Sequence, residues 1–332
     1  MQRILVIQTA FIGDVVLATG LLEKIHQHYP DAELDIAVRK GNESLFDGHP
    51  FLHNVLIWNK RSSKYRHLFQ LLRSIRQRKY DLVINVQRYF ATGFLTAFSG
   101  ADKKIGFDKN PFRLFFTDVI PHQFSGEGDA VHEIQRNHAL IRSLTDNSAA
   151  KPVLYPTKEA FEKVQPYQQC PYICIAPASV WFTKQYPADQ WVQLIKQLPT
   201  NYTIYLLGAP GDKILCDQIR VASGDKAIDL SGQLSFLESA ALMKNAMMNY
   251  VNDSAPMHFA SAMNAPVTAV YCSTIPAFGY GPLSDKSIVV QSAEKLTCRP
   301  CGLHGHAVCP EKHFKCARTI QTEQLLNSLT SL

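Results

Sequence analysis

A glycine and an aspartate near the start of the chain lie where a strand pattern changes to a helix pattern. Residues 4–7 are apolar and typical of a buried strand, residues 15–28 carry apolar side chains at helical spacing, and Gly13 and Asp14 stand between them. In open α/β folds this point is the carboxyl edge of the sheet, where ligands bind. The helix N-terminus favours the ionised form of Asp14. Asp14 is therefore a candidate general base, unless it only caps the helix.

A single lysine stands in a loop of small residues in the second half of the chain. The loop, residues 176–187, follows a predicted strand at 172–175. Its candidate ligand contacts are Ser179, Thr183 and Lys184. Small side chains let backbone N–H groups approach an anion, and lysine supplies a point charge to phosphate. Taken alone, an ordinary loop with a surface lysine explains the pattern better. The turn at Gly208 is a weaker candidate of the same kind, because such turns are common.

A stronger anion site is predicted where a strand at 249–251 is followed by a proline-initiated helix of small residues at 257–263. N–H groups at such a helix start bind phosphates, and Asp253 beside them is placed for sugar hydroxyls. The candidate contacts are Asp253, Ser254, Ala255, Met257 and His258. The alternative is that Asp253 and Ser254 cap the helix and that His258 packs in the core.

Four cysteines are gathered near the end of the chain. Cys298, Cys301, Cys309 and Cys316 have the spacing Cys-x₂-Cys-x₇-Cys-x₆-Cys and are interspersed with histidines. This spacing is compatible with zinc, but the second pair lacks the tight Cys-x₂-Cys arrangement. We therefore favour packed, reduced thiols, or disulfides formed after purification, over a metal site.

The positive charge of the chain is concentrated in one segment. Residues 60–113 contain thirteen Lys or Arg and three Asp, a surplus of ten that exceeds the net charge of +6 for the whole chain. Such a surface attracts polyanions: nucleic acid, anionic lipid headgroups, or an acidic, phosphorylated glycan. A solvated helix face at 64–79 accounts for about half of these charges. No nucleic-acid-binding motif is present, so we expect no nucleic-acid partner.

Strand and helix patterns alternate through both halves of the chain. Strands are predicted at 4–7, 34–38, 54–57, 82–85 and 104–106, then at 172–175, 203–207, 227–229, 249–251 and 267–271. Helices are predicted at 15–28, 64–78 and 130–144, then at 188–197, 211–221, 236–244 and 257–263. The polar stretch 145–158 is a candidate linker. The alternation predicts an α/β protein of two doubly wound, Rossmann-like domains, 1–155 and 156–332, that face a cleft.

Three segments together resemble glycosyltransferase family 9, the ADP-heptose:lipopolysaccharide heptosyltransferases. They are residues 11–19 around Asp14, residues 177–187 around Lys184, and residues 252–258. The resemblance covers nearly the whole chain in order, including a Cys-rich segment that some members carry before the last helix. It implies a GT-B fold with the acceptor on the N-terminal domain and the nucleotide-sugar on the C-terminal domain. It leaves open whether the last helix packs back on the N-terminal domain.

The resemblance also implies roles for individual residues. Asp14 is the base, Lys184 contacts the donor phosphates and Asp253 holds the sugar. The other candidate donor contacts are Ser179, Thr183, Gly208, Ser254, Ala255, Met257 and His258, and the candidate acceptor contacts are Gly13, Asp14, Arg61, Lys64 and Arg88. Ala178, Gln185 and Ala255 depart from the residues usual in the family, and Ala255 crowds the approach to phosphate slightly.

We therefore expect inverting transfer of heptose from ADP-heptose to the inner core of lipopolysaccharide, a lipid-anchored, anionic glycan. No Asp-x-Asp motif is evident, so we expect no metal or other cofactor; the ADP-sugar is a substrate. No apolar run approaches the ~20 residues that span a bilayer. We expect a cytoplasmic protein, either free or peripheral on the cytoplasmic face of the inner membrane. The alternatives are a GT-B transferase or epimerase for another nucleotide-sugar, and a non-catalytic nucleotide- or membrane-binding adaptor.

Overall fold

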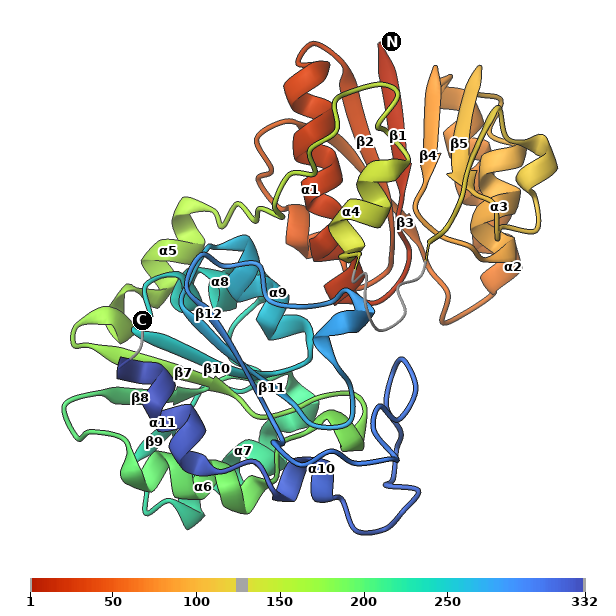
Figure 1. Ribbon diagram of the computed structural model, residues 1–332. Coiled ribbons are helices and arrows are strands. Elements are labelled where there is room, and N and C mark those ends of the chain that lie inside the picture. The colour runs from red at the N-terminus through yellow and green to blue at the C-terminus, as the bar shows by residue number, and fades with distance from the viewer. Residues whose placement is uncertain (1, 124–130, 331–332) are drawn as a thin grey trace. The chain divides into compact units, whose positions relative to one another are not determined.

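The chain forms two compact units, each built on one parallel sheet. The computed structural model describes residues 2–123 and 131–330 (Figure 1). The first unit ends at Tyr155 and the second begins at Pro156. Each sheet has six strands, and all neighbouring strands in it are parallel.

The first sheet has the strand order β3-β2-β1-β4-β5-β6. Its strands are β1 (Arg3–Ile7), β2 (Glu33–Arg39), β3 (Leu52–Trp58), β4 (Leu82–Asn85), β5 (Lys103–Phe107) and β6 (Asp118–Ile120). The helices of this unit are α1 (Ile12–His28), α2 (Lys64–Arg78), α3 (Phe90–Ala97) and α4 (Glu133–Ala139), with the 3-10 helices η1 (Glu43–Phe46) and η2 (Arg113–Phe115). Helix α1 packs with α4, and α2 packs with α3 (Figure 1). The order reverses between β1 and β4, the position at which doubly wound sheets bind ligands.

The second sheet repeats this plan with the order β12-β11-β10-β7-β8-β9. Its strands are β7 (Tyr172–Ala176), β8 (Thr203–Leu206), β9 (Ala227–Asp229), β10 (Met248–Asn252), β11 (Val267–Tyr271) and β12 (Ser287–Gln291). The helices are α5 (Lys158–Val164), α6 (Ala188–Gln197), α7 (Lys213–Ala222), α8 (Phe236–Lys244), α9 (Ala255–Ala262), α10 (Lys315–Arg318) and α11 (Thr322–Thr330). The 3-10 helices are η3 (Gln165–Gln168), η4 (Phe182–Lys184), η5 (Pro210–Asp212) and η6 (Pro276–Phe278). Here the order reverses between β7 and β10, so the loops after these two strands emerge side by side.

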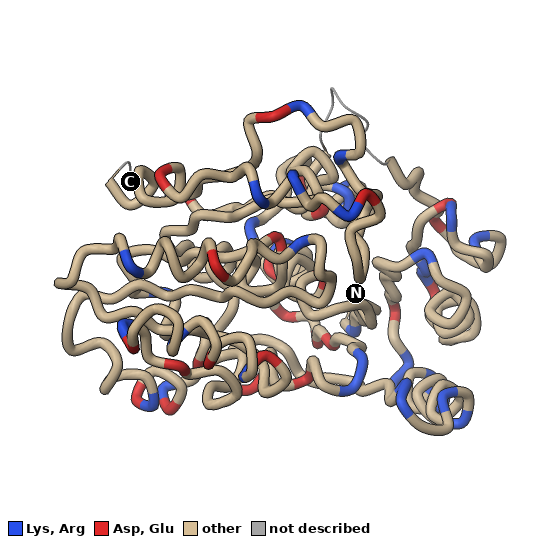
Figure 2. Tube along the Cα trace, turned by 90° about the horizontal axis from the view of Figure 1, so that it is seen from below, with Lys and Arg blue, Asp and Glu red and all other residues tan. Residues whose placement is uncertain are grey.

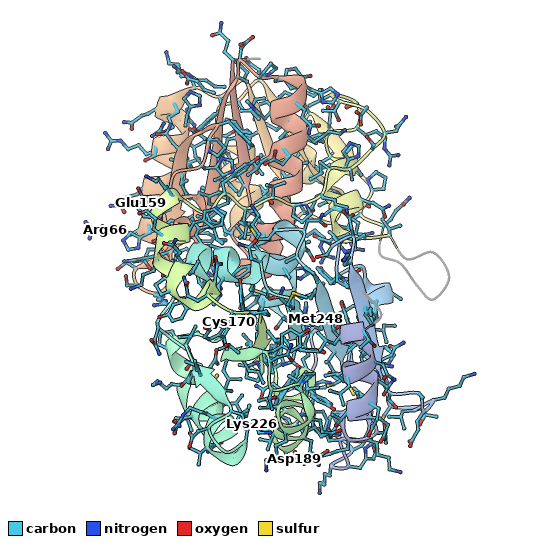
Figure 3. The ribbon with its side chains drawn as sticks, turned by 90° about the vertical axis from the view of Figure 1, so that its left-hand side faces the viewer. Arg66, Glu159, Cys170, Asp189, Lys226 and Met248 are labelled. Atoms are coloured by element: carbon cyan, nitrogen blue, oxygen red, sulfur yellow. The ribbon has the colours of Figure 1, made fainter. Side chains whose placement is uncertain are left out.

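The central strands are buried on both faces, which explains their continuous apolar sequences. Every residue of β7 and β10 is buried. Figure 3 shows the contrast with the surface of the second unit: Met248 lies inside the sheet, whereas Asp189 on α6 and Lys226 are exposed.

The structure contains elements that the sequence patterns did not predict. In helix α3 the two polar side chains, Thr92 and Thr96, are buried; β6 has three residues, and β12 is an edge strand with one buried side chain. Helix α5 begins where the linker was expected to end, and the Thr157 hydroxyl accepts a hydrogen bond from the Ala160 N–H at its start. That cap was visible in the sequence as Thr before a helical pattern.

One helix prediction requires correction. The helix predicted at 130–144 is α4, which ends at Ala139 because the chain continues through tighter turns, such as the bond from the Ile141 N–H to the His138 carbonyl; residue 130 lies outside the described residues. The last helix, α11, packs against the core of the second unit. The Tyr250 hydroxyl donates to the Leu325 carbonyl at 2.9 Å, and Leu325 is part of the second unit's core.

Candidate functional site

Asp14 lies in the first turn of α1, at the carboxyl edge of the first sheet. The residue that caps α1 is Phe11, with an extended backbone and no side-chain cap bond, so Asp14 does not occupy the N-cap position. Asp14 and Gly13 are both partly exposed. Asp14 is thus a partly exposed carboxylate at the positive end of the α1 dipole, at the edge of the sheet where ligands bind.

Cations surround this edge of the sheet. Arg39 ends β2, and its guanidinium lies 4.7 Å from the centre of the Phe11 ring. Burial lowers the pKa of Arg39, whereas the Asp14 carboxylate raises it and Arg61 lowers it, so these charges act on one another. Lys60 Nζ donates to the Thr9 carbonyl at 2.7 Å. Burial, with the charges of Arg39 and Lys64, lowers the pKa of Lys60 to about 8.

The structure places Arg39 and Lys60 in this cationic group. Arg61 and Lys64, which the family resemblance implies as acceptor contacts, also belong to this cationic group, and both are exposed. Neither Arg39 nor Lys60 is among the five acceptor contacts that the family resemblance implies. Their positions in the sequence could have identified them, because Arg39 is the last residue of β2 and Lys60 lies two residues after β3. Both strands end at this edge of the sheet.

A second carboxylate lies near Asp14. Glu133 starts α4, is largely buried, and accepts from Arg136 Nε and Nη2, both at 2.7 Å. Burial raises the pKa of Glu133, Arg136 opposes this rise, and the Asp14 carboxylate adds to it. Arg88, a predicted acceptor contact, is exposed and acts electrostatically on Glu133 as well. Asp14, Glu133, Arg136 and Arg88 thus gather in one region of the first unit.

In the second unit, Lys184 and Asp253 form an ion pair. Lys184 ends η4 in the loop after β7, and Asp253 directly follows β10. Lys184 Nζ lies 2.7 Å from Asp253 Oδ2, and the side chains are 15% and 7% exposed. The Thr274 hydroxyl donates to the same carboxylate oxygen at 2.6 Å. The neighbouring positions of β7 and β10 bring these residues together.

The loop around Lys184 is held by side chains from other segments. The Asn252 side chain accepts from the Tyr186 N–H at 2.9 Å and donates to the Pro177 carbonyl at 2.8 Å. Gln185 donates to the Ser179 carbonyl at 2.7 Å. Thr183 is buried, and its hydroxyl accepts from the His306 N–H at 2.7 Å. Thr183 therefore anchors the loop from inside.

The other predicted donor contacts occupy different environments. Ser254 is the N-cap residue of α9 and makes no side-chain cap bond, and Ala255 follows it at the helix start. Met257 and His258 are buried, as the alternative of a packed histidine requires. At Gly208 an added Cβ would lie 2.9 Å from the Asp212 Cβ, so a close approach of the chain requires glycine there.

The Cys-rich segment packs beside the Lys184 loop. All eight cysteines are free, and Cys298 Sγ lies 3.9 Å from His313 Nε2. Burial and the neighbouring Cys301 and Cys309 thiols raise the pKa of Cys316 to about 12. In the part of the chain that the structure describes, no three His, Cys, Asp or Glu side chains are arranged to hold a metal ion.

Gly305, which the sequence did not single out, supports Lys184. Its φ is +74°, and an added Cβ would lie 2.8 Å from Thr183 Oγ1 and 3.1 Å from Lys184 Cγ. Gly302 provides a matched control because its φ is +68° and nothing lies within 4 Å of an added Cβ. We expect Gly305→Ala and Gly302→Ala to lose about 1–2 kcal/mol of stability each through backbone strain. Only Gly305→Ala should weaken ADP binding in calorimetry; equal ADP affinity in both variants would contradict this role.

The comparisons with known proteins agree with one another. The family model for glycosyltransferase family 9 (heptosyltransferase) matches residues 68–312. Lipooligosaccharide heptosyltransferase 2 of Haemophilus ducreyi is 24% identical over 314 residues, which cover 87% of this chain and 88% of the relative.

Solved structures share the fold over the whole chain. A glycosyltransferase family 9 protein from Veillonella parvula has a TM-score of 0.86 at 21% identity, covering 99% of this chain and 96% of that one. E. coli ADP-heptose lipopolysaccharide heptosyltransferase II has a TM-score of 0.80 at 20% identity, covering 100% and 98%. The similarity confirms the predicted GT-B fold.

Proposed function

Because the chain belongs to glycosyltransferase family 9, we propose that it transfers heptose from ADP-heptose to the inner core of lipopolysaccharide, with inversion at the anomeric carbon. The family match confirms the prediction of a glycosyltransferase, and its relatives are heptosyltransferases. The Lys184–Asp253 pair at the carboxyl edge of the second sheet carries the proposal for the donor. The E. coli relative of known structure is named for ADP-heptose.

In the proposed reaction each unit supplies one part of the chemistry. The acceptor hydroxyl attacks the anomeric carbon, and the Asp14 carboxylate takes its proton. The bond from that carbon to the diphosphate oxygen breaks, and ADP leaves with the bonding electrons. Lys184 and the N-terminus of α9 stabilise the charge that grows on the diphosphate. Asp253, beside Lys184, accepts hydrogen bonds from sugar hydroxyls.

The donor assignment can be tested by ligand-induced stabilisation. A ligand at 100 times its Kd stabilises the folded state by about 2.7 kcal/mol. In a thermal-shift panel we expect ADP-heptose and ADP to raise Tm more than UDP- or GDP-sugars at equal concentration. A larger shift with a non-adenine nucleotide-sugar would favour the alternative of a different donor.

We further propose that the reaction needs no metal ion. Lys184 and the helix N-terminus supply positive charge where a metal would otherwise act on the diphosphate. Turnover should be the same, within twofold, before and after dialysis against EDTA, and elemental analysis should find less than one metal per chain. Loss of turnover with EDTA and its recovery with a divalent metal would contradict this proposal.

The acceptor is proposed to bind at the cationic edge of the first sheet. Arg61→Glu with Arg88→Glu should raise the acceptor KM by about tenfold or more and leave the donor KM unchanged, because close charges attract the anionic glycan. Lys79→Glu with Lys163→Glu is the matched control, since it reverses the same number of charges at exposed lysines: Lys79 precedes β4, whereas Arg88 follows it, and Lys163 lies on α5 of the second unit. If the control raised the acceptor KM equally, the effect would be one of net charge and not of a site. With this lipid-anchored acceptor, we propose that the protein acts at the cytoplasmic face of the inner membrane.

A further inference from the structure

Six phenylalanine rings form one continuous cluster on the first unit. They come from α2, α3 and the segment around η2, and neighbouring ring centres lie 4.9 to 6.1 Å apart. The phenylalanine cluster consists of Phe69, Phe90, Phe94, Phe98, Phe112 and Phe115. Phe94 also packs against the core of the unit, so the cluster is anchored to the fold.

Much of the cluster is exposed. Phe69 is 58% exposed, Phe90 63%, Phe98 39% and Phe115 56%, and the adjoining Leu114 is 88% exposed. Single exposed apolar side chains are ordinary, but a contiguous apolar patch marks a surface that binds a partner or a membrane. The fold leaves these rings uncovered because Phe90, Phe94 and Phe98 are spaced four residues apart along one side of α3, and the short η2 beside them does not cover that side.

The residues around the phenylalanine cluster carry positive charge, which favours an anionic partner. Segments 64–79, 89–98 and 109–117, which supply the rings, contain eight Lys or Arg and no Asp or Glu. Lys and Arg recur along α2, and Arg66, which Figure 3 labels, lies at the surface; Figure 2 shows the distribution of charged residues along the chain. Arg76 Nη1 donates to the Phe98 carbonyl at 3.4 Å. A shallow hollow of about 380 Å³ beside Phe69 is lined by Phe69, Leu72, Arg73, Arg76 and Gln77.

We propose that the phenylalanine cluster inserts into the interface of an anionic lipid bilayer. Exposed aromatic rings bury their apolar surface at the boundary of the acyl chains, and the surrounding arginines meet lipid phosphates at the level of the headgroups. A second copy of the chain fits this surface poorly, because its own cations would face these cations. Among the described residues no helix is long and apolar enough to cross a membrane, so the cluster would act as a peripheral anchor.

The cluster adjoins the region proposed to bind the acceptor. Phe90 follows Arg88 by two residues, and Arg88 belongs to the charged group around Asp14. Insertion of the cluster into the bilayer would hold the carboxyl edge of the first sheet near the lipid headgroups, to which a lipid-anchored glycan is attached. The inference thus deepens the proposed function, although binding to a bilayer can be measured without turnover.

Flotation with vesicles tests the inference. The full chain should float with phosphatidylethanolamine vesicles that contain about one quarter phosphatidylglycerol, and much less with pure phosphatidylcholine vesicles. Leu114→Ser with Phe115→Ser should lower the partition coefficient about tenfold, because two exposed apolar side chains no longer insert. The matched control is Ile214→Ser with Val221→Ser on α7, where the side chains are 74% and 58% exposed. The control should bind like the unmodified protein, and both variants should keep its Tm.

Each of the other outcomes overturns the inference. The first is that the unmodified protein fails to bind the anionic vesicles. The second is that the variant Leu114→Ser with Phe115→Ser binds them as well as the control variant does. A third is that light scattering shows a dimer of the unmodified protein and a monomer of this variant, which would identify a second copy of the chain as the occupant.

Turnover with a soluble, lipid-free acceptor separates the membrane inference from the proposed function: the variant should retain this turnover within twofold. If vesicles are not bound but transfer proceeds, only the membrane anchor fails; if vesicles are bound but no transfer occurs, only the proposed function fails.

Discussion

Asp14→Asn is expected to lower kcat by about 10²–10⁴-fold while the affinity for ADP-heptose stays within threefold, because a general base contributes to the transition state and not to donor binding. The asparagine keeps the size of the side chain and loses its proton-accepting charge. Single-turnover kinetics with saturating acceptor, together with calorimetry of the donor, would measure the two effects separately.

Asp189→Asn is the matched control for this experiment. Asp189 is also an acid in the first turn of a helix, α6, and it is exposed. Loss of a carboxylate from a first helical turn costs about 0.3–1 kcal/mol through the helix dipole. Both variants should therefore show similar small changes in Tm, and only Asp14→Asn should lose turnover. A near-normal kcat in Asp14→Asn would mean that Asp14 serves only the helix.

Lys184→Ala is expected to weaken ADP binding and to lower kcat/KM by about 10²–10³-fold, because the ammonium is needed most as the diphosphate leaves. It should also destabilise the protein. Its 2.7 Å pair with Asp253 is mostly buried, and removing one partner of a buried pair costs up to about 3–5 kcal/mol. Calorimetry with ADP, thermal unfolding and steady-state kinetics together measure these losses.

A double variant separates the binding loss from the folding loss. Lys184→Met with Asp253→Asn leaves no unpaired charge, so it should recover much of the lost Tm while donor affinity and turnover stay low. Asp253→Asn alone should lose more affinity for ADP-heptose than for ADP, because Asp253 is assigned to the sugar. Unchanged ADP affinity and unchanged kcat in Lys184→Ala would overturn the assignment of Lys184 to the phosphates.

The sequence predicted the elements whose patterns are strongest. Buried strands such as β1 and β7 are continuous apolar runs, and α2 has one apolar face. The period of the apolar residues and the length of each segment were therefore sufficient to identify these elements. Helix α3 was missed because its pattern is inverted: its threonines are buried, whereas Phe90 is exposed. The edge strands β6 and β12 were missed because few of their side chains are buried, and β6 has only three residues. These missed elements depend on tertiary packing more than on local pattern.

The site was predicted as separate parts, because a sequence places residues at strand ends but does not give strand order. Lys184 and Asp253 were each placed after a strand, and their ion pair follows from β7 and β10 being neighbours. The contact between Thr183 and His306 had no signal in the sequence, because a loop from the Cys-rich segment makes it. Gly305 was missed for the same reason.

Analysis of the acceptor product tests the central claim most directly. The protein should be incubated with ADP-heptose and an inner-core lipopolysaccharide acceptor in the presence of EDTA, with Asp14→Asn in parallel. We expect the mass of the acceptor to increase by one heptose for each ADP released, with an inverted anomeric configuration by NMR and at most a trace of product from the variant. Release of ADP without a change in the mass of the acceptor, or equal product from Asp14→Asn, would contradict the account.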